Sequence, residues 1–233
     1  MRVLVTRPQP AAAATAARLE ALGHEAILLP LMQAIHDPKA AMEALTQPHT
    51  AIAVTSAEAI RAMTADFGSD LTTPIYCVGA ATADIARKSG FRAVIAGSGT
   101  GASLANLIIR ASATRDGAGL LYLAGRPRSP HFETALAQAG IAFRVAEVYR
   151  MQPIEYQPDD IRAWLALKPQ AVLFYSQETV RRFFRLVPAS MLTDLRNIRL
   201  LCMSSQVADA VPNGLGQTAI AATPSEGSLL ALL

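Results

Sequence analysis

The most constraining feature of the 233-residue sequence is that its second half repeats its first. Residues 3–10, Val-Leu-Val-Thr-Arg-Pro-Gln-Pro, correspond to residues 122–130, which contain Ala-Gly-Arg-Pro-Arg-Ser-Pro. Residues 54–58 match residues 174–178 at nearly the same spacing. A unit of about 115 residues is too long for a solenoid repeat and has the size of a globular domain. The repeat therefore predicts two similar domains.

Short apolar segments alternate with helical patterns in each unit. Strands are predicted at residues 51–54, 74–78, 93–96, 120–123 and 171–174, and helices at residues 11–22, 57–63, 82–89, 103–111, 132–139, 179–186 and 206–211. Continuously apolar strands are typical of parallel sheets covered on both faces. The fold class is therefore α/β, with two doubly wound parallel-sheet domains.

Two polar, proline-containing segments, residues 33–38 and 150–158, follow a strand at the same place in each unit and are predicted linkers. The pattern leaves open whether the domains are contiguous or exchange their front halves.

Cysteine content and hydropathy indicate the compartment. Cys77 and Cys202 occupy equivalent predicted strands, where small apolar core residues are expected. Two cysteines do not form a disulfide framework, so a reducing compartment is expected. No apolar run approaches the roughly 20 residues that cross a bilayer, and no secretory signal is present. We predict a cytoplasmic protein without membrane contact.

The charge balance favours a small anionic ligand over a polymer. The chain has 21 basic and 18 acidic residues, a net charge of +3, and 6% aromatic residues. Nucleic-acid binders carry denser basic stripes and aromatic stacking platforms, so no nucleic-acid partner is predicted.

Small polar residues and arginines gather where the predicted strands end. Each alone is typical of a helix cap, but together they predict a rim that binds oxyanions beside helix N-termini. The predicted rim contains Thr6, Arg7, Thr55, Ser56, Gly79, Ala80, Thr82, Arg126, Tyr175, Ser176, Ser204 and Ser205. Arg128 and Arg150 also lie at a strand end or linker.

Motifs for cofactors and covalent catalysis are missing. The glycine-rich residues 97–101 follow the fifth strand and lack the dinucleotide-loop spacing, and no Walker A sequence is present. The four histidines are scattered, so neither a metal site nor any other cofactor is predicted.

The ordered set of motifs resembles the uroporphyrinogen-III synthase family. The set comprises Leu-Val-Thr-Arg-Pro at residues 4–8, residues 54–56, the turn at residues 78–83, Gly90-Phe91 and residues 148–150. The resemblance implies a discontinuous first domain of residues 1–35 and 152–233, and a second domain of residues 36–151. It also implies cyclisation of hydroxymethylbilane to uroporphyrinogen III, with inversion of ring D and loss of water through a spiro intermediate, without cofactor or metal.

The resemblance assigns site residues as well. It places Thr6, Arg7, Thr55, Ser56, Gly79, Ala80, Thr82, Tyr149, Tyr175 and Ser176 at the substrate. A family tyrosine proposed as the acid aligns with either Tyr156 or Trp164, and Thr82 is a third candidate catalytic residue. Ser204 to Val207 depart from the family's Gly-Pro-x-Thr turn, where Ser204 and Ser205 could compensate as caps.

Two other functions stay open. One is a non-catalytic binding protein for a small polycarboxylate, and the other is a sugar- or nucleotide-dependent enzyme, which the missing phosphate fingerprint disfavours. We expect a monomer, because two domains bury their own cores, with at most transient contact with the upstream deaminase.

Overall fold

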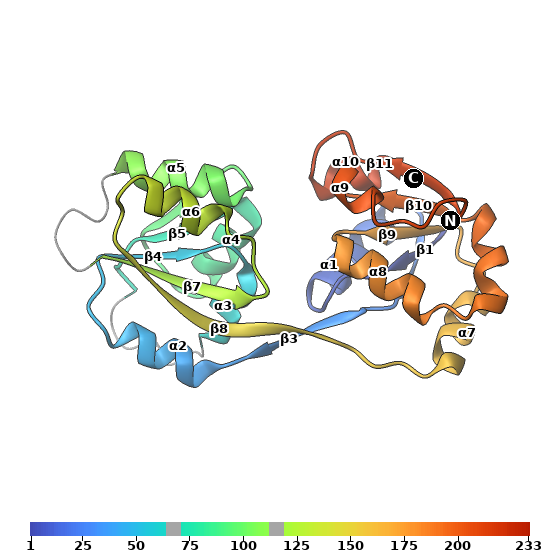
Figure 1. The fold of residues 1–233 in the computed structure, drawn as a ribbon, viewed down its shortest axis with the longest axis horizontal. Helices are drawn as coiled ribbons and strands as arrows, with labels where there is room; N and C mark the ends of the chain where they lie inside the picture. Colours follow the sequence, from blue (N-terminus) through green and yellow to red (C-terminus); the bar gives the residue numbers. More distant parts are fainter. Residues whose placement is uncertain (64–70, 112–118) are drawn as a thin grey trace. The chain divides into compact units, whose positions relative to one another are not determined.

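The chain divides into two compact units in the computed structural model, which describes residues 1–63, 71–111 and 119–233. Unit 1 consists of Met1–Gln33 and Gln152–Leu233, and unit 2 of Ala34–Met151. Figure 1 shows a sheet with flanking helices in each unit. The predicted α/β class with parallel sheets is confirmed.

Unit 1 contains a five-stranded sheet in the order β11-β10-β9-β1-β2. Its strands are β1 (Arg2–Val5), β2 (Glu25–Leu28), β9 (Ala171–Phe174), β10 (Arg199–Cys202) and β11 (Gln217–Ile220). Its helices are α1 (Ala11–Ala21), α7 (Pro158–Ala166), α8 (Gln177–Leu186), the 3-10 helix η1 (Ala189–Asn197), α9 (Ser205–Ala208) and α10 (Glu226–Leu230).

Unit 2 contains a six-stranded sheet in the order β3-β8-β7-β4-β5-β6. Its strands are β3 (Met32–His36), β4 (Ala51–Val54), β5 (Ile75–Cys77), β6 (Val94–Ala96), β7 (Leu120–Arg126) and β8 (Phe143–Pro153). Its helices are α2 (Pro38–Leu45), α3 (Ala57–Ala62), α4 (Ala80–Lys88), α5 (Gly101–Ala111) and α6 (His131–Gln138).

Both faces of each sheet are covered, as continuously apolar strands require. In β4, Ile52 and Val54 pack with α2, α3 and α4, whereas Ala51 and Ala53 pack with α5 and α6 (Figure 1). In unit 1, α7, α8, η1 and α9 cover one face, and α1 and α10 cover the other. The alternation of side chains along a strand thus gives each unit two apolar layers.

The repeat is visible in the strand order. Strands β2, β1, β9, β10 and β11 of unit 1 follow one another across the sheet as β8, β7, β4, β5 and β6 do in unit 2. Cys77 and Cys202, the last residues of β5 and β10, are both fully buried free thiols.

The segments predicted as irregular linkers contain regular structure. Strand β3 includes residues 33–36, and β8 continues to Pro153. The helices α2, α7, η1 and α10 lie outside the predicted ranges. The prolines that begin α2 and α7 are the residues at which the predicted linkers end, and each occupies the first helical turn, where proline is tolerated.

Candidate functional site

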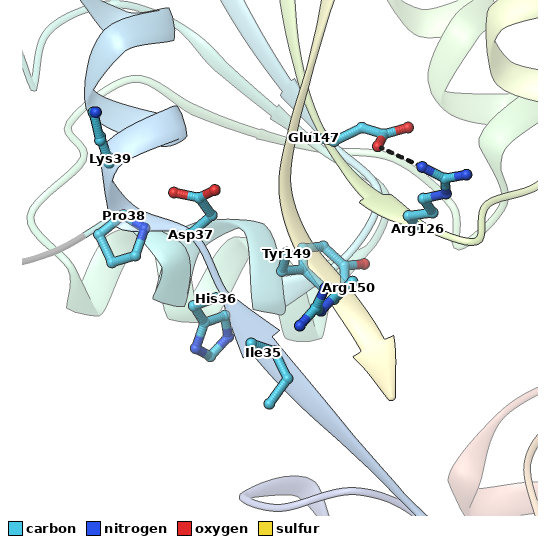
Figure 2. Close-up of a pocket in the computed structure, with 9 residues that line it drawn as sticks. All are labelled: Ile35, His36, Asp37, Pro38, Lys39, Arg126, Glu147, Tyr149 and Arg150. Carbon is cyan, nitrogen blue, oxygen red and sulfur yellow. Dashed lines mark ion pairs between the residues drawn. The ribbon is translucent and has the colours of Figure 1, made fainter. Parts of the chain in front are cut away.

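A pocket of about 480 Å³ lies within unit 2, beside the ends of β3, β7 and β8. Figure 2 shows its lining residues, Ile35, His36, Asp37, Pro38, Lys39, Arg126, Glu147, Tyr149 and Arg150. Four elements supply them, because β8 lies between β3 and β7 in the sheet, and α2 begins directly after β3.

Cationic side chains outnumber anionic ones around this pocket. Lys39, Arg126, Arg150 and the titratable His36 face two carboxylates, Asp37 and Glu147. The Asp37 carboxylate is already engaged, because it accepts a hydrogen bond of 3.0 Å from the backbone N–H of Ala40 and caps α2.

Arg126 is one of two exposed guanidinium groups that line the pocket, the other being Arg150. The Arg126 side chain is 75% exposed and lies 3.8 Å from Glu147, as the dashed line in Figure 2 marks. Glu147 is held more closely by Arg128, at 2.6 Å, and Arg128 also binds Glu133 at 2.6 Å. Arg126 is therefore free to exchange its distant partner for a ligand carboxylate.

Tyr149 forms the inner wall of the pocket. Burial raises the pKa of its phenol, a hydrogen bond with Ser56 lowers that pKa, and the nearby Glu58 carboxylate raises it again. The Tyr149 ring centroid lies 6.5 Å from that of His36, whose Nε2 is 2.8 Å from Glu58 Oε2. At neutral pH the phenol thus keeps its proton.

The other predicted residues of unit 2 have structural contacts. Thr55 Oγ1 lies 2.8 Å from the Tyr122 hydroxyl, and Ser56 caps α3 through the N–H of Glu58. Gly79 precedes α4, where a Cβ would lie 3.3 Å from Gly99 Cα.

The residues that follow Gly79 differ in exposure. Ala80 is exposed at the start of α4, whereas Thr82 is buried with 7% exposure. The structure therefore brings Ser56 and Arg126 to Tyr149 and its pocket, but the turn of Gly79, Ala80 and Thr82 is not among the lining residues.

In unit 1, Arg7 and Tyr175 belong to a polar group that we call the Glu226 cluster: Arg7, Thr15, Arg18, Tyr175 and Glu226. Arg7 donates to Glu226 at 2.9 Å and lies over the Tyr175 ring, 4.3 Å from its centroid. Thr15, Arg18 and the Tyr175 hydroxyl donate to the same carboxylate. The protein's own carboxylate therefore occupies the anion-binding groups predicted at this strand end.

The remaining strand-end residues of unit 1 are caps or are buried. Thr6 is fully buried and donates to the Leu173 carbonyl at 2.6 Å. Ser176 accepts from the N–H of Thr179, and Ser204 from that of Val207, whereas Ser205 is exposed. Ser176 and Ser204 are therefore helix caps, whereas the hydroxyl of Thr6 is used inside the sheet.

Tyr156 and Trp164, the two candidates for the acid, pack against each other. Their ring centroids are 4.8 Å apart at an interplanar angle of 78°. The Tyr156 hydroxyl donates to the Pro30 carbonyl at 2.8 Å, and burial raises the pKa of Tyr156, with Asp160 adding to the rise. The proton of Tyr156 is therefore committed to the backbone of unit 1.

His36, Asp37 and Lys39 line the pocket but are missing from the sequence-based site. The signal for them was the segment His36-Asp37-Pro38, in which a strand end meets a helix cap followed by proline. Glu226 lies in the small polar segment 223–228 that follows the last predicted strand, but its pairing with Arg7 was not predicted.

Residues 1–63, 71–111 and 119–233 hold no group of three or more His, Cys, Asp or Glu side chains that could bind a metal ion. Within those ranges, no helix combines the length and apolar character that crossing a bilayer requires.

Known proteins resemble this chain in sequence and in fold. The family model described as uroporphyrinogen-III synthase HemD matches residues 13–231. No curated protein matches the chain. The fold is similar to that of uroporphyrinogen-III synthetase from Helicobacter pylori, with a TM-score of 0.64 and 18% identity over 100% of this chain and 98% of that one. A mutant uroporphyrinogen III synthase from Thermus thermophilus gives a TM-score of 0.54 and 24% identity over 99% and 96% of the two chains.

Proposed function

The chain belongs to the uroporphyrinogen-III synthase family, whose enzymes cyclise hydroxymethylbilane in haem biosynthesis, and we propose that the unit 2 pocket holds substrate carboxylates during this reaction. The observation that carries the proposal is the cationic excess around Arg126, whose weak pairing with Glu147 leaves it available.

The chemistry asks for positioning more than for a strong nucleophile. The ring A hydroxyl leaves as water after gaining a proton, which gives an azafulvene cation. Ring D attacks this cation through its substituted carbon, and the spiro intermediate then fragments and closes with ring D inverted. A proton is lost at the end, so one donated proton and one released proton balance. Arginines that hold the acetate and propionate groups fix the folded shape of the linear chain.

Tyr149 is the proton donor that we propose for the departure of water. Its phenol is protonated at neutral pH, lies in the wall of the pocket and is oriented by Ser56. Tyr156 is the competing candidate from the sequence, although its hydroxyl is bonded to Pro30. Trp164 offers only an indole N–H, which is not an acid at physiological pH.

The reaction is tested in a coupled assay. Hydroxymethylbilane is generated in situ, the purified protein is added, and the oxidised porphyrins are separated into isomers I and III. A rise in isomer III supports the cyclase. Isomer I alone, at the spontaneous rate, contradicts it and favours a polycarboxylate-binding protein.

The proton donor is tested by a matched pair of variants. Tyr149→Phe is expected to lower kcat for isomer III about 100-fold, the usual contribution of a general acid. Tyr156→Phe removes one hydroxyl in the same way but leaves the pocket unchanged, so kcat is expected to stay within about twofold of the parent. The reverse order would assign the acid to Tyr156.

We also propose that the protein acts as a cytoplasmic monomer, with transient contact to the deaminase that supplies its unstable substrate. Two-layered cores within each unit support the monomer. Light scattering at assay concentration tests it, and a stable dimer would contradict it.

A further inference from the structure

Gly125 lies against the aromatic ring of Tyr149. The two residues are register partners on β7 and β8, immediately after an irregularity at Ala124 and Gly125. A Cβ on Gly125 would lie 2.5 Å from Tyr149 Cε2 and closer still to Cζ and Oη. Real Cβ atoms essentially never approach another heavy atom within 3.0 Å, so any side chain here displaces the ring.

The ring has little room to withdraw from such a side chain. Tyr149 packs against the apolar cluster that contains Val54 and Val148, and its hydroxyl lies near enough to Ser56 for that residue to lower the pKa of the phenol. The remaining direction is toward the pocket that Tyr149 lines. A methyl group at Gly125 would therefore move the Tyr149 phenol toward the interior of the unit 2 pocket.

Backbone conformation does not explain the glycine. The φ angle of Gly125 lies outside the left-handed region, in contrast to that of Gly119, with φ +75° at the entrance to the same strand. The φ of Gly125 is therefore open to alanine, and the three atoms nearest to the added Cβ all belong to the Tyr149 ring and its hydroxyl.

The repeat supplies an independent comparison. The position equivalent to Gly125 in unit 1 is Thr6, which precedes Arg7 as Gly125 precedes Arg126. Thr6 carries a fully buried side chain that donates to Leu173. The same strand end thus accepts a side chain in unit 1.

We propose that Gly125 is a positioning residue for the synthase reaction. Because Gly125 has no side chain, the Tyr149 ring can occupy the space beside it, which keeps the Tyr149 hydroxyl near Ser56. This inference rests on the proposed role of the Tyr149 pocket. Gly125 touches no substrate and acts only through Tyr149.

A double-mutant cycle measured by thermal stability tests the steric contact between Gly125 and the Tyr149 ring without using activity. Gly125→Ala is expected to lower the Tm clearly in the parent and hardly at all in a Tyr149→Ala background, where the ring is absent. Gly227→Ala is the matched control, because a Cβ there meets nothing within 4 Å and its backbone is not left-handed. If Gly125→Ala fails to fold, recovery of the fold by Tyr149→Ala supports the steric contact between residue 125 and the Tyr149 ring. An equal loss in both backgrounds overturns it.

Activity and titration test the positioning role. Gly125→Ala is expected to lower kcat for isomer III about 100-fold, as small misplacements of catalytic groups do, with a smaller change in KM. In a Tyr149→Phe background, Gly125→Ala should cause no further loss of kcat, because the hydroxyl is already absent. In ¹³C-tyrosine NMR spectra, the pKa of Tyr149 should fall toward its ordinary value, since burial is what raises it.

The two proposals fail in distinguishable ways. If Tyr149→Phe retains full kcat while the stability cycle shows coupling, the pocket assignment is wrong and with it the positioning role, although the steric contact stands. If Tyr149→Phe loses kcat and Gly125→Ala does not, Gly125 is not a positioning residue and the proposed function is unaffected.

Discussion

At the scale of single residues, the availability of each arginine depends on the carboxylates around it. Arg7 is paired with Glu226, 219 positions away in the sequence, whereas Arg126 keeps only a distant contact with Glu147. The sequence predicted the same role for both, because both end the first strand of a repeat. No local pattern could place α10 beside Arg7, so this difference required the structure.

We expect Arg126→Gln to raise the KM for hydroxymethylbilane about tenfold or more, the effect of losing a charge-assisted hydrogen bond. Because the interaction is made in the ground state as well, kcat should change less than KM. Steady-state isomer III assays measure both. Arg87→Gln serves as the control, since Arg87 is an exposed residue of α4 that pairs with Asp84 and does not line the pocket. An unchanged KM in Arg126→Gln would remove Arg126 from the site.

Glu226→Gln is expected to lower the free energy of unfolding by about 1–3 kcal/mol, because several donors lose a charged acceptor in a largely buried place. Thermal unfolding followed by circular dichroism provides the measurement. Glu43→Gln is the control, and its exposed pair with Lys39 contributes little. A Tm equal to that of the control would show that the Glu226 cluster does not stabilise unit 1.

At the scale of elements, two buried strands were predictable to the residue, β5 and β7 were predicted with shifted bounds, and the polar strands were missed. Strands β4 and β9 occupy residues 51–54 and 171–174 as predicted, since both are apolar throughout and buried throughout. Strand β3 is buried only at its first residue, and the end of β8 alternates in exposure and includes Pro153, so both segments have the polar composition of linkers. The pocket between them was therefore not predicted, although Arg126, Tyr149 and Arg150 were named individually.

Variants of the serines at the helix N-termini can distinguish a capping role from a ligand-binding role. Ser176→Ala removes the acceptor of the Thr179 N–H and should lower stability by about 1 kcal/mol. Because a cap touches no ligand, the KM should not change. Ser205→Ala is the matched control, since Ser205 is exposed inside α9 and is not its cap. Denaturant unfolding and the isomer III assay, run on both variants, give the comparison; a raised KM in Ser176→Ala would restore Ser176 to the site.

At the scale of the whole molecule, the stability should fall in alkaline solution. Burial raises the pKa of Cys77 and of Cys202 from 9.0 to about 11, and burial also raises the pKa of all five tyrosines. Since the folded state favours the neutral forms, their contribution is complete below pH 9 and is lost as the pH rises from about 9 to about 11.

Urea unfolding midpoints at several pH values across this range measure the loss. The Cys77→Ala, Cys202→Ala double variant should show a shallower decline, because it lacks the two thiols. A midpoint that stays constant to pH 11 would contradict the assignment of these groups as buried and neutral.

The division of unit 1 between the two ends of the chain has a consequence during protein synthesis. Strand β1 pairs with β9, and the contact between Arg2 and Gln170 joins residues 168 positions apart. At typical translation speeds the first strand leaves the ribosome roughly 10–30 s before its partner is made. Unit 2, a contiguous stretch, emerges completely in that interval. The nascent chain therefore carries a finished domain while β1 still lacks β9, one of its two neighbouring strands, and a chaperone that shields nascent apolar segments would act on residues 1–33.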